Sequence, residues 1–234
     1  MTEGNEFHGA LLTSGFRASL LLTGTKDQTL RGVRGRVYRG RMNQQELFLL
    51  ADATLRSVID QLTPEQLALP APTAWSRTEN PTLRDILASH AKDEAWVPDV
   101  VAGRTIEEVG DRWEGDLLGD DPIGSYDRLN DAASAALAHP LHLEHVVHLS
   151  YGDFPMSTYF EHTTFYRTFQ AWDIAKLAGL DSTLPPELVD GVWELVEVQV
   201  EELRAIHVFG PEIPVPAGAD AQTRLLCVTG FWHE

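Results

Sequence analysis

The 234-residue sequence contains a single cysteine, Cys227. One cysteine excludes a disulfide scaffold and any site built on a Cys-x-x-Cys pair, and it is typical of a reducing cytoplasm. Because its neighbours 225–228 are apolar, we expect an inert core thiol. No apolar run approaches the roughly 20 residues that cross a bilayer. The first residues are acidic, unlike a secretory signal. These features predict a soluble, cytoplasmic protein.

Basic residues are also scarce: 18 Lys and Arg stand against 35 Asp and Glu, for a net charge of −17. Nucleic-acid binding needs a basic face, and anionic membranes repel an acidic one. We therefore expect neither partner. Hydrophobic residues make up 43% of the chain, enough for a sizeable core. The expected partner is a small-molecule ligand, and a homodimer is the oligomeric state to test.

The few basic residues are unevenly placed. Residues 1–41 hold seven of them and only three acidic residues, which leaves 11 basic and 32 acidic residues for 42–234. The run RGVRGRVYRGR at 31–41 is typical of a flexible basic arm. We predict a disordered N-terminal segment over 1–41, or sequence upstream of a true start at Met42. The folded domain is expected over 42–234.

Apolar periodicity and capping signals predict a mainly helical chain. Long helices are expected over 44–61, 82–101, 123–138, 157–177 and 185–207, and a short one over 222–228. Residues 146–151 are typical of a strand that turns at Gly152 and Asp153 and returns through Phe154. Long helices with one hairpin predict an all-α antiparallel four-helix bundle with a small β-hairpin and a C-terminal extension.

Four histidines recur every third residue, at His139, His142, His145 and His148. A metal site needs ligands that converge on one point. Because this run crosses Pro140 and passes from a helix end into a strand, we expect the rings to diverge. The acid-rich segment 111–121 lacks the pattern of a calcium loop and is expected to be a solvated loop. Phosphate-binding glycine loops and the common hydrolase motifs are missing as well.

Polar residues form a stripe on each of two predicted helices. The stripe on 157–177 consists of His162, Tyr166, Gln170 and Asp173, and that on 82–101 of Ser89, Asp93 and Trp96. If both stripes face the bundle interior, they form a polar pocket between two helices, a usual place for a site in a bundle. If they do not, each is simply the solvated face of its helix.

Several stretches carry a family likeness. They are AWVPD at 95–99, VAGRTIEEV at 101–109, GDLLGDDP at 115–122, VHLSYGD at 147–153, AWDIA at 171–175, FGPEIPVPA at 209–217 and QTRLL at 222–226. In this order and spacing they resemble the DinB-like superfamily, in particular the metal-binding domain of actinobacterial mycothiol-dependent maleylpyruvate isomerases and their uncharacterised relatives. The likeness covers about 42–226 and implies a four-helix bundle of DinB-like type.

The resemblance also implies a divalent metal, often Zn²⁺ or Ni²⁺, which activates the thiol of mycothiol. At the matching ligand positions this sequence has Ser89, Tyr166 and Gln170. His90 is displaced from the first of these by one residue, about 100° around a helix. We therefore expect the family metal to be lost and no cofactor to be needed. An ion relocated to His162 and Asp93 is the alternative.

These residues predict an isomerase- or transferase-like enzyme that performs isomerisation, cyclisation or proton transfer on a small carbonyl compound. Tyr166, His162 and Asp93 are the expected acids and bases, and Ser89, Gln170, Trp96 and Asp173 the expected substrate contacts. One alternative is a small-molecule-binding protein without catalysis. The other is a metal- and mycothiol-dependent isomerase or transferase, as in the family.

Overall fold

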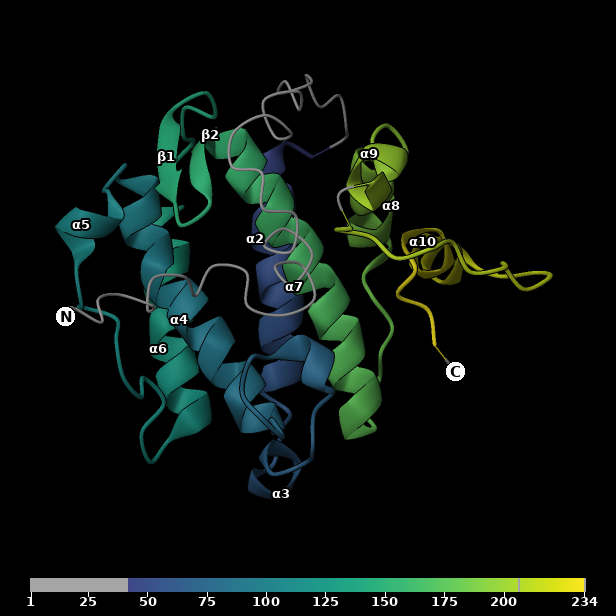
Figure 1. Cartoon of the computed structure of the whole chain (residues 1–234), viewed down its shortest axis with the longest axis horizontal. Helices are drawn as coiled ribbons and strands as arrows, with labels where there is room; N and C mark the ends of the chain where they lie inside the picture. The colour runs from purple at the N-terminus through teal and green to yellow at the C-terminus, as the bar shows by residue number, and fades with distance from the viewer. Residues whose placement is uncertain (1–41, 206, 234) are drawn as a thin grey trace, which may run out of the picture.

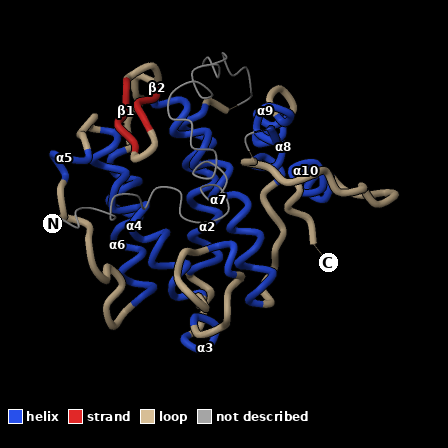
Figure 2. Tube along the Cα trace, in the orientation of Figure 1, coloured by secondary structure: helices blue, strands red, loops and turns tan. Residues whose placement is uncertain are grey.

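The computed structural model describes residues 42–205 and 207–233, so the predicted N-terminal segment 1–41 lies outside the described residues. The described chain is mainly helical with one small antiparallel sheet, as predicted (Figure 2). Its long helices are α2 (Gln44–Ile59), α4 (Leu83–Val101), α6 (Pro122–Ala136) and α7 (Met156–Ala178). Each lies within a few residues of a predicted helix. No helix in 42–205 or 207–233 combines the length and apolarity that a membrane crossing requires.

The long helices begin and end at the signals that the sequence carries. At the start of α2 the side chain of Asn43 accepts from the Glu46 amide at 2.9 Å, and the Glu46 carboxylate accepts from the Asn43 amide at 2.8 Å. This reciprocal pair satisfies two amides that have no partner within the helix. Gly179, with φ of 70°, ends α7, because a left-handed residue closes a helix at little cost when it is glycine.

The hairpin consists of β1 (Val146–Leu149) and β2 (Gly152–Pro155), and Leu149 pairs with Gly152. The turn is therefore Ser150 and Tyr151, and the predicted turn at Gly152 and Asp153 is wrong by two residues. Gly152 has φ of 143° and begins the return strand, so its backbone freedom is used just after the turn. Tyr151 consequently sits at the tip of the hairpin instead of inside a strand.

The predicted helix 185–207 is divided into α8 (Pro186–Val196) and α9 (Val200–Ala205). At the break the side chain of Gln199 donates to the Leu195 carbonyl at 3.0 Å. Its backbone amide bonds to Val196 at 3.0 Å, one residue closer than in an α-helix. Such local bonding competes with the helical ladder. Helix α10 (Ala221–Thr229) follows and agrees with the predicted short helix. The connections hold α3 (Pro64–Leu67), a 3₁₀ turn (Thr73–Trp75) and α5 (Ile106–Val109).

The long helices lie as two close pairs, α2 along α7 and α4 along α6 (Figure 1). On the side of α7 away from α4 and α6, the C-terminal part of the chain packs against α7. There Phe169 stacks on Phe231 with ring centroids 4.2 Å apart, and Phe209 meets Phe165 at 5.5 Å. Helix α7 is thus enclosed on both sides. A helix in this position can bury polar as well as apolar residues.

Candidate functional site

The polar stripe of α7 lies inside the protein. His162, Tyr166, Gln170 and Asp173 are each at most 8% exposed. On α4, His90, Asp93 and Glu94 are at most 3% exposed. The interpretation of the α7 stripe as a solvated face is therefore wrong. Burying so many polar groups costs free energy unless they find partners, so their contacts decide what the region does.

Arg167 of α7 is the charged centre of this interior, and its side chain is 1% exposed. Its Nη1 lies 3.1 Å from Oδ1 of Asp52 on α2, and its Nη2 donates to Oε1 of Glu94 on α4 at 2.6 Å. The guanidinium carbon sits 4.4 Å from the ring centroid of Phe48. Burial opposes the charge of Arg167, but Asp52 and Glu94 outweigh it and raise its pKa. Arg167 thus joins three helices. Arg167 was not predicted as a site residue, although a lone arginine among Phe160, Phe165 and Phe169 was a visible signal.

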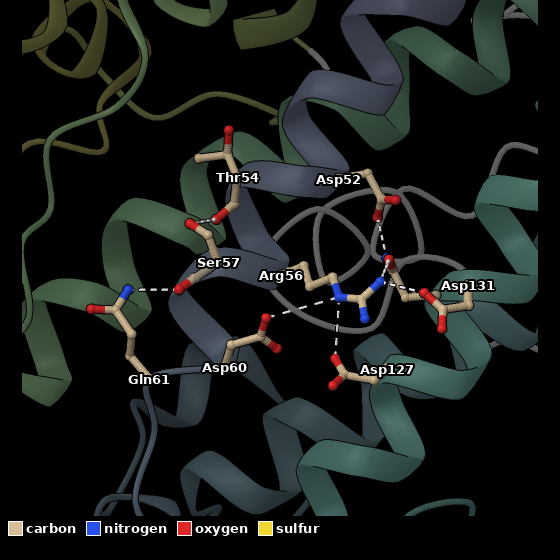
Figure 3. Close-up of polar contacts among 9 residues, drawn as sticks. Asp52, Thr54, Arg56, Ser57, Asp60, Gln61, Asp127 and Asp131 are labelled. Atoms are coloured by element: carbon tan, nitrogen blue, oxygen red, sulfur yellow. Dashed lines mark hydrogen bonds and ion pairs between the residues drawn. The ribbon is translucent and has the colours of Figure 1, made fainter.

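A chain of polar contacts runs from Arg167 toward the surface. Asp52 accepts from the side chain of Asn130 at 2.8 Å, and Asn130 accepts from Arg56 at 3.1 Å. Figure 3 shows Arg56 extended from α2 toward the acidic residues of α6, where it meets Asp127 at 3.2 Å and Asp131 at 2.6 Å. These contacts fix α2 against α6 and hold Asp52 in place beside Arg167.

His90 is the residue of α4 that faces the stripe of α7. Its ring stacks on Tyr166 with centroids 4.8 Å apart. Burial and the charge of Arg167 lower the pKa of His90 to about 3, and Gln170 acts in the opposite direction. The imidazole is therefore neutral across the physiological range. Gln170 faces His90 closely enough to raise its pKa as a hydrogen-bond partner, but within the described residues neither ring nitrogen of His90 nor Oε1 of Gln170 makes a well-formed hydrogen bond. Counting along the sequence assigned the ligand position to Ser89 and placed His90 about 100° away from it, whereas the structure turns His90 toward α7.

Asp93 and Glu94 are two adjacent residues of α4 whose carboxyl groups lie in the same interior region. Burial raises the pKa of Asp93 well above its usual value, and the charges of Arg167 and Lys92 oppose this only in part. Burial likewise raises the pKa of Glu94, against the pull of Arg167. Oδ1 of Asp93 has no hydrogen-bond partner in the part of the chain that the structure describes. Asp93 therefore keeps its proton to a higher pH than an exposed carboxyl group does, and it can give that proton up or take it back.

His162 lies one turn before Tyr166, beneath the tip of the hairpin. The Tyr151 hydroxyl is 3.1 Å from its Nδ1, and the ring of Phe154 meets it edge-on at 6.1 Å. Burial lowers the pKa of His162 to about 4. The charge of Asp93 is close enough to raise the pKa of Tyr151, so the hairpin tip lies near both residues. Tyr151 was not predicted as a site residue, because the sequence pattern placed it inside a strand.

Three predicted substrate contacts lie elsewhere. Ser89 donates to the Asp85 carbonyl of its own helix at 3.2 Å. Trp96 belongs to the apolar cluster next to the hairpin. Asp173 lies 3.1 Å from Nε2 of His233, and burial raises its pKa to about 6. Of the predicted residues, only Asp93, His162, Tyr166 and Gln170 lie in the buried polar array, which we define as these four with His90, Glu94, Tyr151 and Arg167.

The remaining sequence features lie outside this array. His148 pairs across the hairpin with Asp153 at 2.7 Å, and His145 packs beside Gly103. Cys227 is fully buried, which confirms the expected core thiol. In the predicted acidic loop, Asp116 accepts from Arg84 at 2.9 Å.

The comparisons with known proteins add nothing to this geometry: no family model matches the chain, and neither a curated protein nor a solved structure matches it. The DinB-like resemblance therefore depends on the stretches quoted above.

The donor atoms present where the resemblance implies a metal do not suit Zn²⁺ or Ni²⁺. The groups that meet there are the imidazole of His90, the phenol of Tyr166 and the amide of Gln170. Zn²⁺ and Ni²⁺ favour imidazole, thiolate and carboxylate ligands. Over 42–205 and 207–233, no three or more His, Cys, Asp or Glu side chains gather as a metal site would require. The relocated ion between His162 and Asp93 likewise finds no third such ligand among these residues.

Proposed function

We propose that this protein is a DinB-like small-molecule enzyme whose buried polar array transfers protons on a small carbonyl compound without the family metal. In this proposal α2, α4, α6 and α7 are the antiparallel bundle of the DinB-like type. The observation that supports it is the meeting of His90 with Tyr166 and Gln170, because these hydrogen-bonding groups lie in the region where the resemblance implies a reactive centre.

The chemistry divides between a proton carrier and groups that polarise the carbonyl. Because burial raises its pKa, Asp93 keeps its proton to a higher pH than an exposed carboxyl group does and, once ionised, is a stronger base. It is the candidate acid and base. Neutral His90 can donate an N–H to a carbonyl oxygen without adding a charge, as neutral imidazoles do in other isomerases. Tyr166, stacked on His90, can orient the same oxygen.

Arg167 acts through these groups. From α7 its guanidinium donates a hydrogen bond to Glu94 of α4, and Glu94 directly follows Asp93 in the chain. It is a positioning residue, since its guanidinium is bound to Asp52 and Glu94. Tyr151 sets the ring of His162 from the hairpin. His162 keeps its predicted acid–base role in the proposal as a neutral donor or acceptor next to Tyr166.

Deuterium exchange tests the proposal directly. The purified protein is incubated in D₂O with small ketones, 2-oxo acids and aminoketones, and loss of the proton next to the carbonyl is followed by ¹H NMR. We expect catalysed exchange for at least one compound. Asp93→Asn and Tyr166→Phe should each slow it on the order of 10²-fold. His142→Gln and Asp190→Asn change exposed residues and serve as controls. Exchange at the same rate in Asp93→Asn would contradict the proposal.

The same preparation separates the two alternatives. Ligand binding without exchange in any compound favours a binding protein without catalysis. Elemental analysis of untagged protein addresses the metal- and mycothiol-dependent enzyme: close to one equivalent of Zn²⁺ or Ni²⁺, with exchange that requires a thiol, would overturn the metal-free proposal.

A further inference from the structure

The buried polar array, together with the neighbouring Asp52, contains more carboxyl groups than cations. Asp52, Asp93 and Glu94 are each at most 3% exposed. Arg167 is the one lysine or arginine among the described residues that is buried to the same degree, and its guanidinium is already engaged by Asp52 and Glu94. The neighbouring Lys92 instead reaches Glu114 at 2.8 Å on the exposed side of α4. Asp93 therefore has a buried carboxyl group and no cation of its own.

Among the described residues, several of the buried side-chain atoms that lack a hydrogen-bond partner in this region are acceptors. They are Oδ1 of Asp93, Oε2 of Glu94, Oε1 of Gln170 and one ring nitrogen of His90. Within 42–205 and 207–233, Nε of Arg167 and the hydroxyl of Tyr159 also lack a hydrogen-bond partner. A neutral imidazole has one acceptor nitrogen and one donor. All four acceptor side chains are more than nine-tenths buried. A ligand that satisfies such a set must bring several donors, and a protonated amine brings up to three with a positive charge.

The surroundings also suit a cation. His90 and Asp93 are three residues apart on α4 and so share one side of the helix, and Tyr166 and Gln170 are one turn apart on α7. Tyr151 and Tyr159 lie close enough to Asp93 for its charge to raise the pKa of both phenols. Phenol oxygens can accept hydrogen bonds from a cation. An anionic ligand would instead face Asp93 and Glu94.

We infer that the natural ligand of this array is a small organic cation, an amine whose ammonium group is bound by Asp93, His90 and Gln170. This inference rests on the proposed function, since it names the charge of that enzyme's substrate. The ammonium replaces the proton on Asp93, which leaves for solvent, so the buried charge stays balanced. The groups that face Asp93 in this exchange are Glu94 and Lys92 of α4, Arg167 and Tyr159 of α7, and Tyr151 of the hairpin.

Probes matched in shape and different in charge test the inference. Binding of n-butylamine, benzylamine and 1-amino-2-propanone is measured by ligand-observed NMR and calorimetry at pH 7.5. Their partners are the uncharged n-butanol, benzyl alcohol and hydroxyacetone, together with butyrate and pyruvate as anions. We expect the amines to bind roughly ten- to hundredfold more tightly than the alcohols. Calorimetry in buffers with different protonation enthalpies should show a proton released on amine binding.

Two variants assign the effect to the array. Asp93→Asn keeps the shape and removes the charge, and it should abolish the preference for amines. Gln170→Met keeps the bulk and removes one acceptor, and it should weaken amine binding more than alcohol binding. Asp190→Asn removes an exposed charge on α8 and should change nothing. Unfolding midpoints confirm that each variant is folded.

The outcomes separate this inference from the proposed function. Equal binding of amines and alcohols, a preference for anions, or no binding of any probe would overturn the inference. Catalysed exchange on an uncharged or anionic carbonyl compound, with no amine bound, would leave the proposed function standing and remove the inference. Amine binding that depends on Asp93, with no exchange in any compound, would support the inference and contradict the proposed function.

Discussion

The two sides of helix α7 meet the interior of the protein in opposite ways. Toward the C-terminal part of the chain, α7 presents Phe165 and Phe169, which pack against other aromatic rings. Toward α4 it presents Tyr166, Arg167 and Gln170, where several polar atoms of the array have no partner in the described chain. The apolar side stabilises the fold by burial. The polar side costs stability, and natural proteins retain such costs where function needs them.

The largest expected effect lies on the apolar side. Phe169→Ala removes a ring that stacks on Phe231 and meets Phe209, and it should lower the free energy of unfolding by about 3–5 kcal/mol. Phe169→Leu keeps most of the volume and should cost less than about 1.5 kcal/mol. Urea denaturation measures both. An alanine variant as stable as wild type would show that the C-terminal part of the chain does not pack on α7 in solution.

Removing the buried cation should come second. Arg167→Met leaves Asp52 and Glu94 without their counter-charge, and we expect a loss of about 3 kcal/mol. The triple variant Asp52→Asn, Glu94→Gln and Arg167→Met removes the charges together and should recover most of this stability. A triple variant less stable than the single one, in the same denaturation experiment, would mean that the ion pairs themselves stabilise the fold.

Acid should weaken the polar side through its histidines. Burial lowers the pKa of His162 to about 4, so below its ordinary pKa of 6.5 the unfolded chain binds more protons than the folded one. The stability that His162 contributes is full above pH 6.5 and declines as pH falls toward 4, by up to about 3 kcal/mol for the complete shift. Denaturation from pH 4 to 7 should show a shallower slope in His162→Gln than in wild type. His142→Gln, at an exposed position, should keep the wild-type slope.

The smallest expected effect on stability is also the most informative about function. Tyr166→Phe keeps the ring that stacks on His90 and removes only the hydroxyl. We expect the free energy of unfolding to change by less than about 1 kcal/mol, while proton exchange on the carbonyl substrate falls. A variant that loses both stability and activity would indicate that the hydroxyl has a structural role.

Much of the fold followed from local signals in the sequence. The reciprocal cap of Asn43 and Glu46, Pro122 in the first turn of α6 and Gly179 after α7 mark helix ends that a short stretch of chain specifies by itself. The hairpin turn was misplaced by two residues because Gly152 has a positive φ in the return strand and not at the turn. The division of α8 from α9 was missed because the Gln199 side chain bonds back to Leu195.

The candidate site was also predicted only in part from the sequence. The spacing of His162, Tyr166 and Gln170 on one face of α7 was visible in the sequence, because residues four apart in a helix share a face. The spacing could not say whether that face was buried. On α4, counting residues along the helix assigned the site position to Ser89. In the structure Ser89 donates to its own helix, and it is His90 that faces Tyr166.

The sequence alone determined the acidic charge, the helical class and the polar stripe of α7, because composition and periodicity are properties of the chain itself. Only the tertiary structure decided that the C-terminal part of the chain covers one side of α7. It also decided that Arg167 joins Asp52 and Glu94 across three helices, and that Asp93 is buried without a cation of its own. These facts depend on which distant residues meet, and burial then sets the charge of each group by withdrawing it from water.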